Sequence, residues 1–89
     1  MKAWPAPLVR LFLGESTPAQ TLAAADDSNP KTKREQVCEA NFYNGKWELL
    51  NDAKDEAGRL FRLAASDCPK NFIEWFTANA ELKALGTTP

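Results

Sequence analysis

The chain has 89 residues, a formal net charge of -1, two cysteines and no histidine. A chain of this length is one small domain or a fragment of a larger one, and its core is modest. The near-neutral charge argues against a surface for nucleic acid or anionic membrane, and the missing histidine removes the commonest general base and metal ligand.

Two short helices are expected in the first third of the chain, one over 7–13 and one beginning after Thr17. Proline is tolerated in the first turn of a helix, and Gly14 is a typical stop for the first helix. Thr17 is expected to cap the second helix, with Gln20 three residues later completing a capping box. The polar segment 26–33 that follows is expected to be a loop.

Three longer helices are expected over 33–50, over 54–66 and from a cap at Asn71 to Gly86. Glu74, three residues after Asn71, would complete a second capping box. Apolar residues recur at helical spacing, and no stretch of useful length alternates as a strand would. The sequence therefore predicts an all-α fold of about five antiparallel helices. The apolar positions are Val37, Ala40, Phe42, Tyr43, Trp47 and Leu50, then Ala57, Leu60, Phe61, Ala64 and Ala65, then Phe72, Trp75, Phe76, Leu82 and Leu85.

The two central helices have the residue spacing of a tetratricopeptide repeat, a unit of two antiparallel helices in about 34 residues. In this family, small residues let the two backbones approach, an aromatic residue fills the gap towards the next unit, and a proline sets the turn that follows. The alternative interpretation is that any helical hairpin has small residues where its helices cross. The matching positions are Gly45, Ala57, Phe61, Ala64 and Pro69.

The repeat register divides this single domain into a degenerate helix pair over 1–30, a repeat unit over 38–71 and a capping helix over 72–86. One unit cannot bury its own face. The outer helices are therefore expected to pack on either side of the central pair, as a fragment of a right-handed α–α superhelix. Asn44 and Glu48 depart from the pattern, because these positions are usually a large apolar residue and an aromatic residue.

Four segments extend the similarity beyond the general repeat: VRLFLG (9–14), CEANFYNGK (38–46), LFRLAASDCPKNFIE (60–74) and AELKALG (80–86). Together they resemble the C-terminal part of NlpI-like lipoproteins of Gram-negative bacteria. The resemblance implies a helical-repeat adaptor on the periplasmic side of the outer membrane. Members of that group dimerise and bring a processing protease and cell-wall hydrolases to their substrates. The chain lacks their lipid-attachment segment and earlier repeats, so we expect an excised portion or a shortened relative.

The two cysteines lie near the start of the third expected helix and just past the end of the fourth. These ends are neighbours in an antiparallel hairpin, so Cys38 and Cys68 are within reach of a disulfide. Such a bond would suit an oxidising periplasm. The alternative is a pair of buried, reduced thiols, for which a cytoplasmic location is expected. A redox-active pair is not expected, because the sequence has no C-x-x-C motif and no histidine partner.

A peptide groove is expected on the concave surface, which the first helix of each unit lines in tetratricopeptide scaffolds. Lysines and aromatic residues there would hold an extended peptide through its carboxylate or acidic side chains. The alternatives are that the aromatic residues belong to the core and that the lysines are solvated surface charges. The groove candidates are Glu39, Phe42, Lys46, Leu49, Lys70, Asn71, Ile73, Phe76, Ala80 and Lys83.

The sequence thus predicts a non-enzymatic protein–protein interaction scaffold, with an unidentified protein or peptide partner and with a homodimer as a further expectation. The alternative is a structural segment that caps or dimerises a longer helical-repeat protein. The sequence contains no phosphate loop and no nucleophile motif. No enzymatic activity, cofactor or metal is therefore expected, and neither is a nucleic-acid partner or a transmembrane segment.

Overall fold

The computed structural model describes residues 4–86, which form five α-helices. No strand occurs in this part of the chain, so the predicted all-α class is confirmed. Residues 1–3 and 87–89 of the predicted domain lie outside the described residues. The helices span Ala6–Phe12 (α1), Pro18–Ala24 (α2), Pro30–Leu50 (α3), Lys54–Asp67 (α4) and Ile73–Ala84 (α5).

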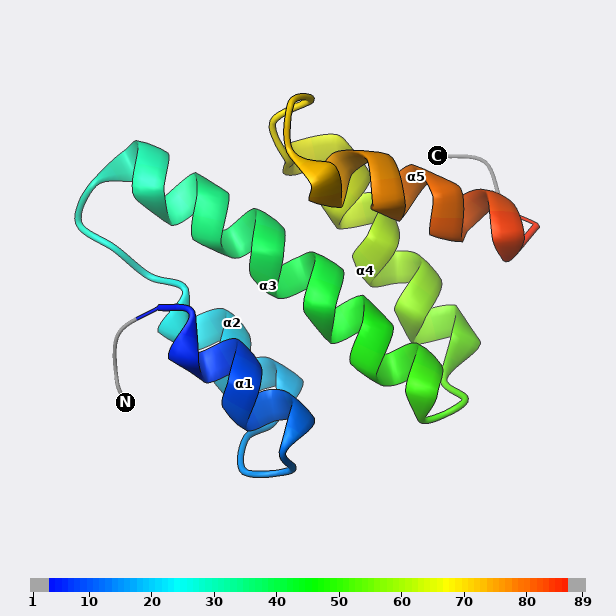
Figure 1. Cartoon of the computed structure of the whole chain (residues 1–89), viewed down its shortest axis with the longest axis horizontal. Coiled ribbons are helices and arrows are strands. Elements are labelled where there is room, and N and C mark those ends of the chain that lie inside the picture. Colours follow the sequence, from blue (N-terminus) through cyan, green and yellow to red (C-terminus); the bar gives the residue numbers. More distant parts are fainter. Residues whose placement is uncertain (1–3, 87–89) are drawn as a thin grey trace.

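The helices pack around the antiparallel pair α3 and α4 (Figure 1). In Figure 1, α1 lies in front of α2 and α5 lies in front of α4, while α3 crosses between the two pairs. Both α1 and α2 contact α3, and α5 contacts α4 more extensively than α3. The outer helices therefore flank the central pair. A superhelical arrangement of the tetratricopeptide type stays a prediction from the sequence.

A capping box begins α2, and glycines end α1 and α5, as the sequence predicts. The Thr17 hydroxyl accepts a hydrogen bond from the Gln20 N–H at 3.2 Å, and the Gln20 side chain accepts one from the Thr17 N–H at 3.0 Å. Gly14 follows α1 and Gly86 follows α5, each with φ of +77°. This left-handed conformation costs glycine little, so both residues stop their helices.

The third helix begins three residues earlier than predicted, at Pro30. The side chain of Asn29 accepts hydrogen bonds from the N–H groups of Lys31 and Thr32, at 2.9 and 3.1 Å. Asn29 is therefore the N-cap, and Pro30 takes the first helical position, where its missing N–H is no loss. The expected loop over 26–33 is shorter than predicted, because its second half belongs to α3.

The predicted capping box at the start of α5 is wrong. The N-cap is Phe72, and no side chain of the described residues caps the helix. The Phe72 N–H donates instead to the carbonyl oxygen of Pro69 at 2.9 Å, a turn that leaves Asn71 exposed one residue before the cap. Glu74 is only 8% exposed, and its carboxylate accepts a hydrogen bond from the Tyr43 hydroxyl at 3.4 Å.

Asn29, which caps α3, and Asn71, which does not cap α5, offer a matched test of the helix starts. Asn29→Ala removes two hydrogen bonds to the first turn of α3, so we expect the free energy of unfolding to fall by about 1 kcal/mol. Asn71→Ala makes the same change at an exposed turn residue that caps no helix, and we expect less than about 0.5 kcal/mol. Urea unfolding followed by circular dichroism measures both. Equal losses in the two variants would contradict the cap at Asn29.

The core lies between α3, α4 and α5, and at Gly45 the backbone of α3 lies directly against a side chain of α4. A Cβ atom built on Gly45 would lie 2.7 Å from Cε1 of the Phe61 ring. A small residue of α3 thus nests against an aromatic residue of α4. The buried core cluster comprises Cys38, Phe42, Ala57, Phe61, Ala64, Cys68, Ala78 and Leu82.

Two buried amides of α3 hold α2 in place. Asn44 donates through Nδ2 to the carbonyl oxygen of Pro18 at 3.0 Å, and Gln36 donates through Nε2 to the carbonyl oxygen of Ala25 at 3.0 Å. These two carbonyl groups lie at opposite ends of α2, so α3 binds both ends of its backbone. Buried polar groups need such partners. This contact explains why Asn44 departs from the usual apolar residue of the repeat pattern.

Cys38 and Cys68 form a disulfide in the structure, with their Cα atoms 4.8 Å apart. Both residues are buried. The bond joins the first half of α3 to the residue that follows α4, which is the pairing predicted from the hairpin. The structure therefore contains a disulfide and not the alternative pair of reduced thiols.

Candidate functional site

An open apolar groove with a volume of about 550 Å³ lies between α1 and α3. Three of its apolar side chains are well exposed: Val9 by 48%, Phe12 by 44% and Leu13 by 65%. These side chains do not belong to the buried core cluster; they form an apolar wall that faces the groove. The main lining residues are Leu8, Val9, Phe12 and Leu13 on the α1 side, and Glu39 and Tyr43 on α3.

The local sequence explains why α1 exposes apolar residues. The helix is only seven residues long and buries Ala6, Pro7 and Leu11. The segment 9–13 is apolar at every position except Arg10. One face of a helix can bury only part of such a segment, and the remaining apolar residues then face outward. The apolar wall of the groove therefore consists of the α1 side chains that α2 and α3 do not cover.

A carboxylate, Glu39, lies against this apolar wall. Its Oε1 accepts a hydrogen bond from Trp4 Nε1 at 3.2 Å. Burial raises the pKa of the Glu39 carboxyl above its ordinary value, the hydrogen bond from Trp4 lowers it, and the carboxylates of Glu74 and Glu35 raise it again. Among the described residues that line the groove, Glu39 alone carries a charge, so this side of the groove is acidic.

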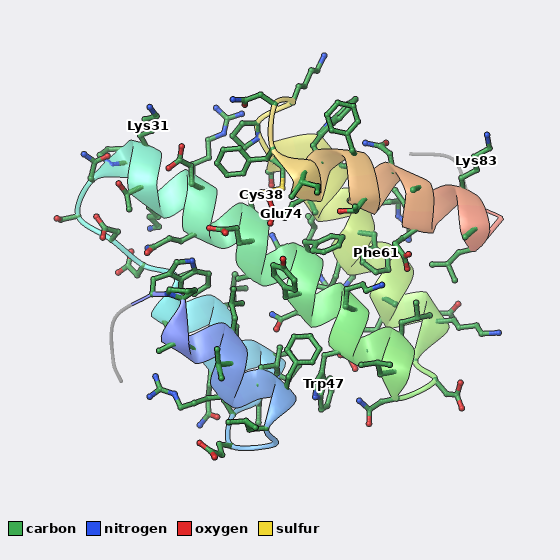
Figure 2. The ribbon with its side chains drawn as sticks, viewed as in Figure 1. Lys31, Cys38, Trp47, Phe61, Glu74 and Lys83 are labelled. Carbon is green, nitrogen blue, oxygen red and sulfur yellow. A yellow bond between two sulfur atoms is a disulfide. The ribbon has the colours of Figure 1, made fainter. Side chains whose placement is uncertain are left out.

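Tyr43 connects the apolar wall to the acidic side. Its ring lies edge-on to the ring of Phe12, with centroids 6.4 Å apart, and its hydroxyl donates to Glu74 Oε2. Burial, followed by the nearby carboxylates of Glu74 and Glu39, raises the pKa of the Tyr43 hydroxyl. Tyr43 therefore stays neutral and keeps its proton for hydrogen bonding. Figure 2 shows Glu74 on α5, next to α3.

The predicted candidates on α3 have three different environments. Glu39 lines the groove between α1 and α3. Phe42 is buried in the core with its ring 5.8 Å from that of Phe61, which agrees with the alternative interpretation of this residue. Lys46 forms an ion pair with Glu81 of α5, Nζ to Oε1 3.6 Å. Leu49 is partly buried against the core. Only Glu39 of these four faces the groove between α1 and α3.

The other candidates lie on the turn before α5 and on its outer face. Ile73 is 70% exposed and Phe76 60% exposed, and Ala80 and Lys83 are exposed on the same helix. This stripe is opposite the residues with which α5 packs on the core, such as Leu82. The structure thus does not bring the ten candidates together at one site. The remaining two, Lys70 and Asn71, are exposed in the preceding turn.

Sequence reasoning missed most of the groove. The apolar residues of α1 were not among the candidates, although the run of apolar residues in 9–13 was visible in the sequence. Tyr43 was assigned to the apolar face of its helix, and Glu74 was assigned to a cap. Glu39, Tyr43 and Glu74 lie near one another because α5 packs on α3. The residue spacing along the chain does not predict this packing.

Within residues 4–86, Cys, Asp and Glu side chains nowhere gather in the groups of three or more that would hold a metal ion. None of the helices described combines the length and the apolar character needed to cross a membrane. Comparison with known proteins finds no matching family model and no matching solved structure. The resemblance to NlpI-like lipoproteins therefore stays an expectation drawn from the sequence.

Proposed function

We propose that the chain is a non-enzymatic helical scaffold that binds a segment of another protein in the groove between α1 and α3. The apolar wall carries this proposal, because Val9, Phe12 and Leu13 expose apolar surface beside a groove of about 550 Å³. Clustered exposed apolar residues in a protein of this size are typical of interaction sites, and the volume suits a few side chains of a partner.

The proposed setting is the periplasm, where the scaffold would be part of an adaptor of the cell envelope. The disulfide between Cys38 and Cys68 supports this setting, because such bonds form and persist in oxidising compartments. The resemblance to periplasmic lipoproteins supports it independently. A chain in the reducing cytoplasm would lose a cross-link on which its small core depends.

Peptide selection tests the groove. Short random peptides displayed on phage are selected on the wild-type chain, and the dissociation constants of the selected peptides are measured by fluorescence anisotropy. Val9→Glu and Leu13→Glu place a charge on the apolar wall, so we expect binding to weaken about tenfold or more, or about 1.4 kcal/mol. Both side chains are well exposed, so the fold should tolerate the changes.

Leu50→Glu is the matched control, because Leu50 is 75% exposed at the end of α3 and does not line the groove. Its affinity for the selected peptides should equal that of the wild type. The proposal fails if no peptide is selected, or if the selected peptides bind the groove variants and the wild type equally well.

A second function is favoured by the outer face of α5, where Ile73 and Phe76 are exposed. In a longer helical-repeat protein this face would pack against the next unit or against a second copy, and the chain would cap or dimerise the array. Light scattering separates the two functions. A stable dimer that Phe76→Asp dissociates, together with an absence of peptide binding, would favour the structural role.

A further inference from the structure

The charge of the groove differs from that expected from the sequence. The lysines of the candidate set do not line it, since Lys46 pairs with Glu81 and Lys83 is exposed on α5. The polar residues beside the apolar wall are instead Glu39 and Tyr43, and Tyr43 is in contact with the carboxylate of Glu74. A peptide with acidic side chains would meet like charges here.

Glu39 is the carboxylate placed to meet a bound peptide. It lines the groove, is partly exposed, and uses Oε1 for the hydrogen bond from Trp4. Glu74 and Glu35 are close enough to shift its pKa upward, as expected for a carboxylate with like charges nearby. A cationic group at Glu39 would relieve this repulsion, whereas a neutral group would leave it in place.

We propose that the groove recognises a peptide segment in which a lysine or arginine is flanked by apolar side chains. The apolar residues would pack on Val9, Phe12 and Leu13, and the cation would form a charge-assisted hydrogen bond with the Glu39 carboxylate. Charge complementarity selects this occupant, because it matches both the apolar wall and the acidic side. The inference rests on the proposed function and specifies the chemistry of the partner.

A double-mutant cycle between peptide and protein tests the contact. Peptides selected on the wild-type chain should be enriched in lysine or arginine next to apolar residues. Replacing that basic residue by glutamine should weaken binding about tenfold, and replacing it by glutamate should weaken it further. With the Glu39→Gln protein, the lysine and glutamine peptides should bind within about twofold of each other, because the amide can still accept the bond from Trp4 but carries no charge.

Glu48→Gln is the matched control. Glu48 lies on α3 as well, but it borders a different hollow, next to α2 and α4. The variant changes the net charge of the protein by the same amount and should keep the preference for the basic peptide. If Glu39→Gln loses its fold in circular dichroism, Glu74→Gln replaces it, and the preference should then fall by a smaller factor.

The outcomes separate the two proposals. If the lysine, glutamine and glutamate peptides bind the wild type equally, or the glutamate peptide binds most tightly, the charge inference is overturned while the scaffold function stands. A preference for lysine that Glu39→Gln and Glu48→Gln leave unchanged also overturns it. If the wild type selects no peptide at all, the scaffold function fails, and the inference fails with it.

Discussion

Removing the disulfide between Cys38 and Cys68 is expected to lower the free energy of unfolding by about 3–4 kcal/mol. The two residues are 30 apart in sequence, and the chain-entropy model gives roughly this value for a loop of that length. The bond closes the hairpin of α3 and α4, whose buried residues form most of the core. Small domains have only about 5–15 kcal/mol of stability, so this loss would be a large share of the total.

The Cys38→Ala/Cys68→Ala double variant and the oxidised wild type are compared by urea unfolding. Both cysteines are buried among apolar residues, so alanine removes the cross-link without burying a polar group. A reductant should destabilise the wild type and leave the double variant unchanged. If the double variant unfolded at the same urea concentration as the oxidised wild type, the cross-link would contribute nothing to stability.

The fourth helix was predictable because it packs with one face only. Ala57, Leu60, Phe61 and Ala64 are buried at helical spacing, and the exposed side of α4 is polar at most positions. The sequence pattern therefore predicts the first and last residues of α4 to within one residue, and it predicts these four core residues.

The third helix shows why the same reasoning is less complete elsewhere. It is covered by α1 and α2 on one side and by α4 and α5 on the other, so its buried residues do not form one apolar stripe. Gln36 and Asn44 are buried because they hydrogen-bond to the backbone ends of α2. Leu50, an expected apolar position, is 75% exposed at the end of the helix. Whether such a position is buried depends on its tertiary partners, which the helical periodicity of the sequence does not specify.

The site was less predictable than the fold for the same reason. Lys46 was a groove candidate, but its charge is paired with Glu81, which comes from a helix that follows much later in the sequence. Glu39, another of the candidates, lines the groove between α1 and α3, which is a different surface from the concave one expected from the repeat pattern. Its acidic surroundings depend on Glu74, which α5 places close to α3. The sign of the charge in the groove therefore follows from packing between helices.

Gly45→Ala is expected to lower the free energy of unfolding by about 1–3 kcal/mol, even though alanine is the better helix former by about 1 kcal/mol. The added Cβ would lie 2.7 and 2.9 Å from two atoms of the Phe61 ring, closer than van der Waals contact allows. The ring is fully buried and packs near the ring of Phe42. Because the ring is enclosed in the core, we expect α3 and α4 to separate slightly to admit the methyl group.

Gly58→Ala is the matched control, because Gly58 is a buried glycine inside α4 whose added Cβ would have only Arg62 Nη1 within 4 Å, at 3.8 Å. That substitution should stabilise the protein by up to about 1 kcal/mol through helix propensity alone. Phe61→Leu removes the ring that the Cβ would strike, so in this background Gly45→Ala should cost much less than in the wild type. Thermal unfolding of the four variants and the wild type measures the coupling between the two positions. If Gly45→Ala stabilised the wild type as much as Gly58→Ala does, α3 and α4 would not be held together by a glycine nested against an aromatic ring.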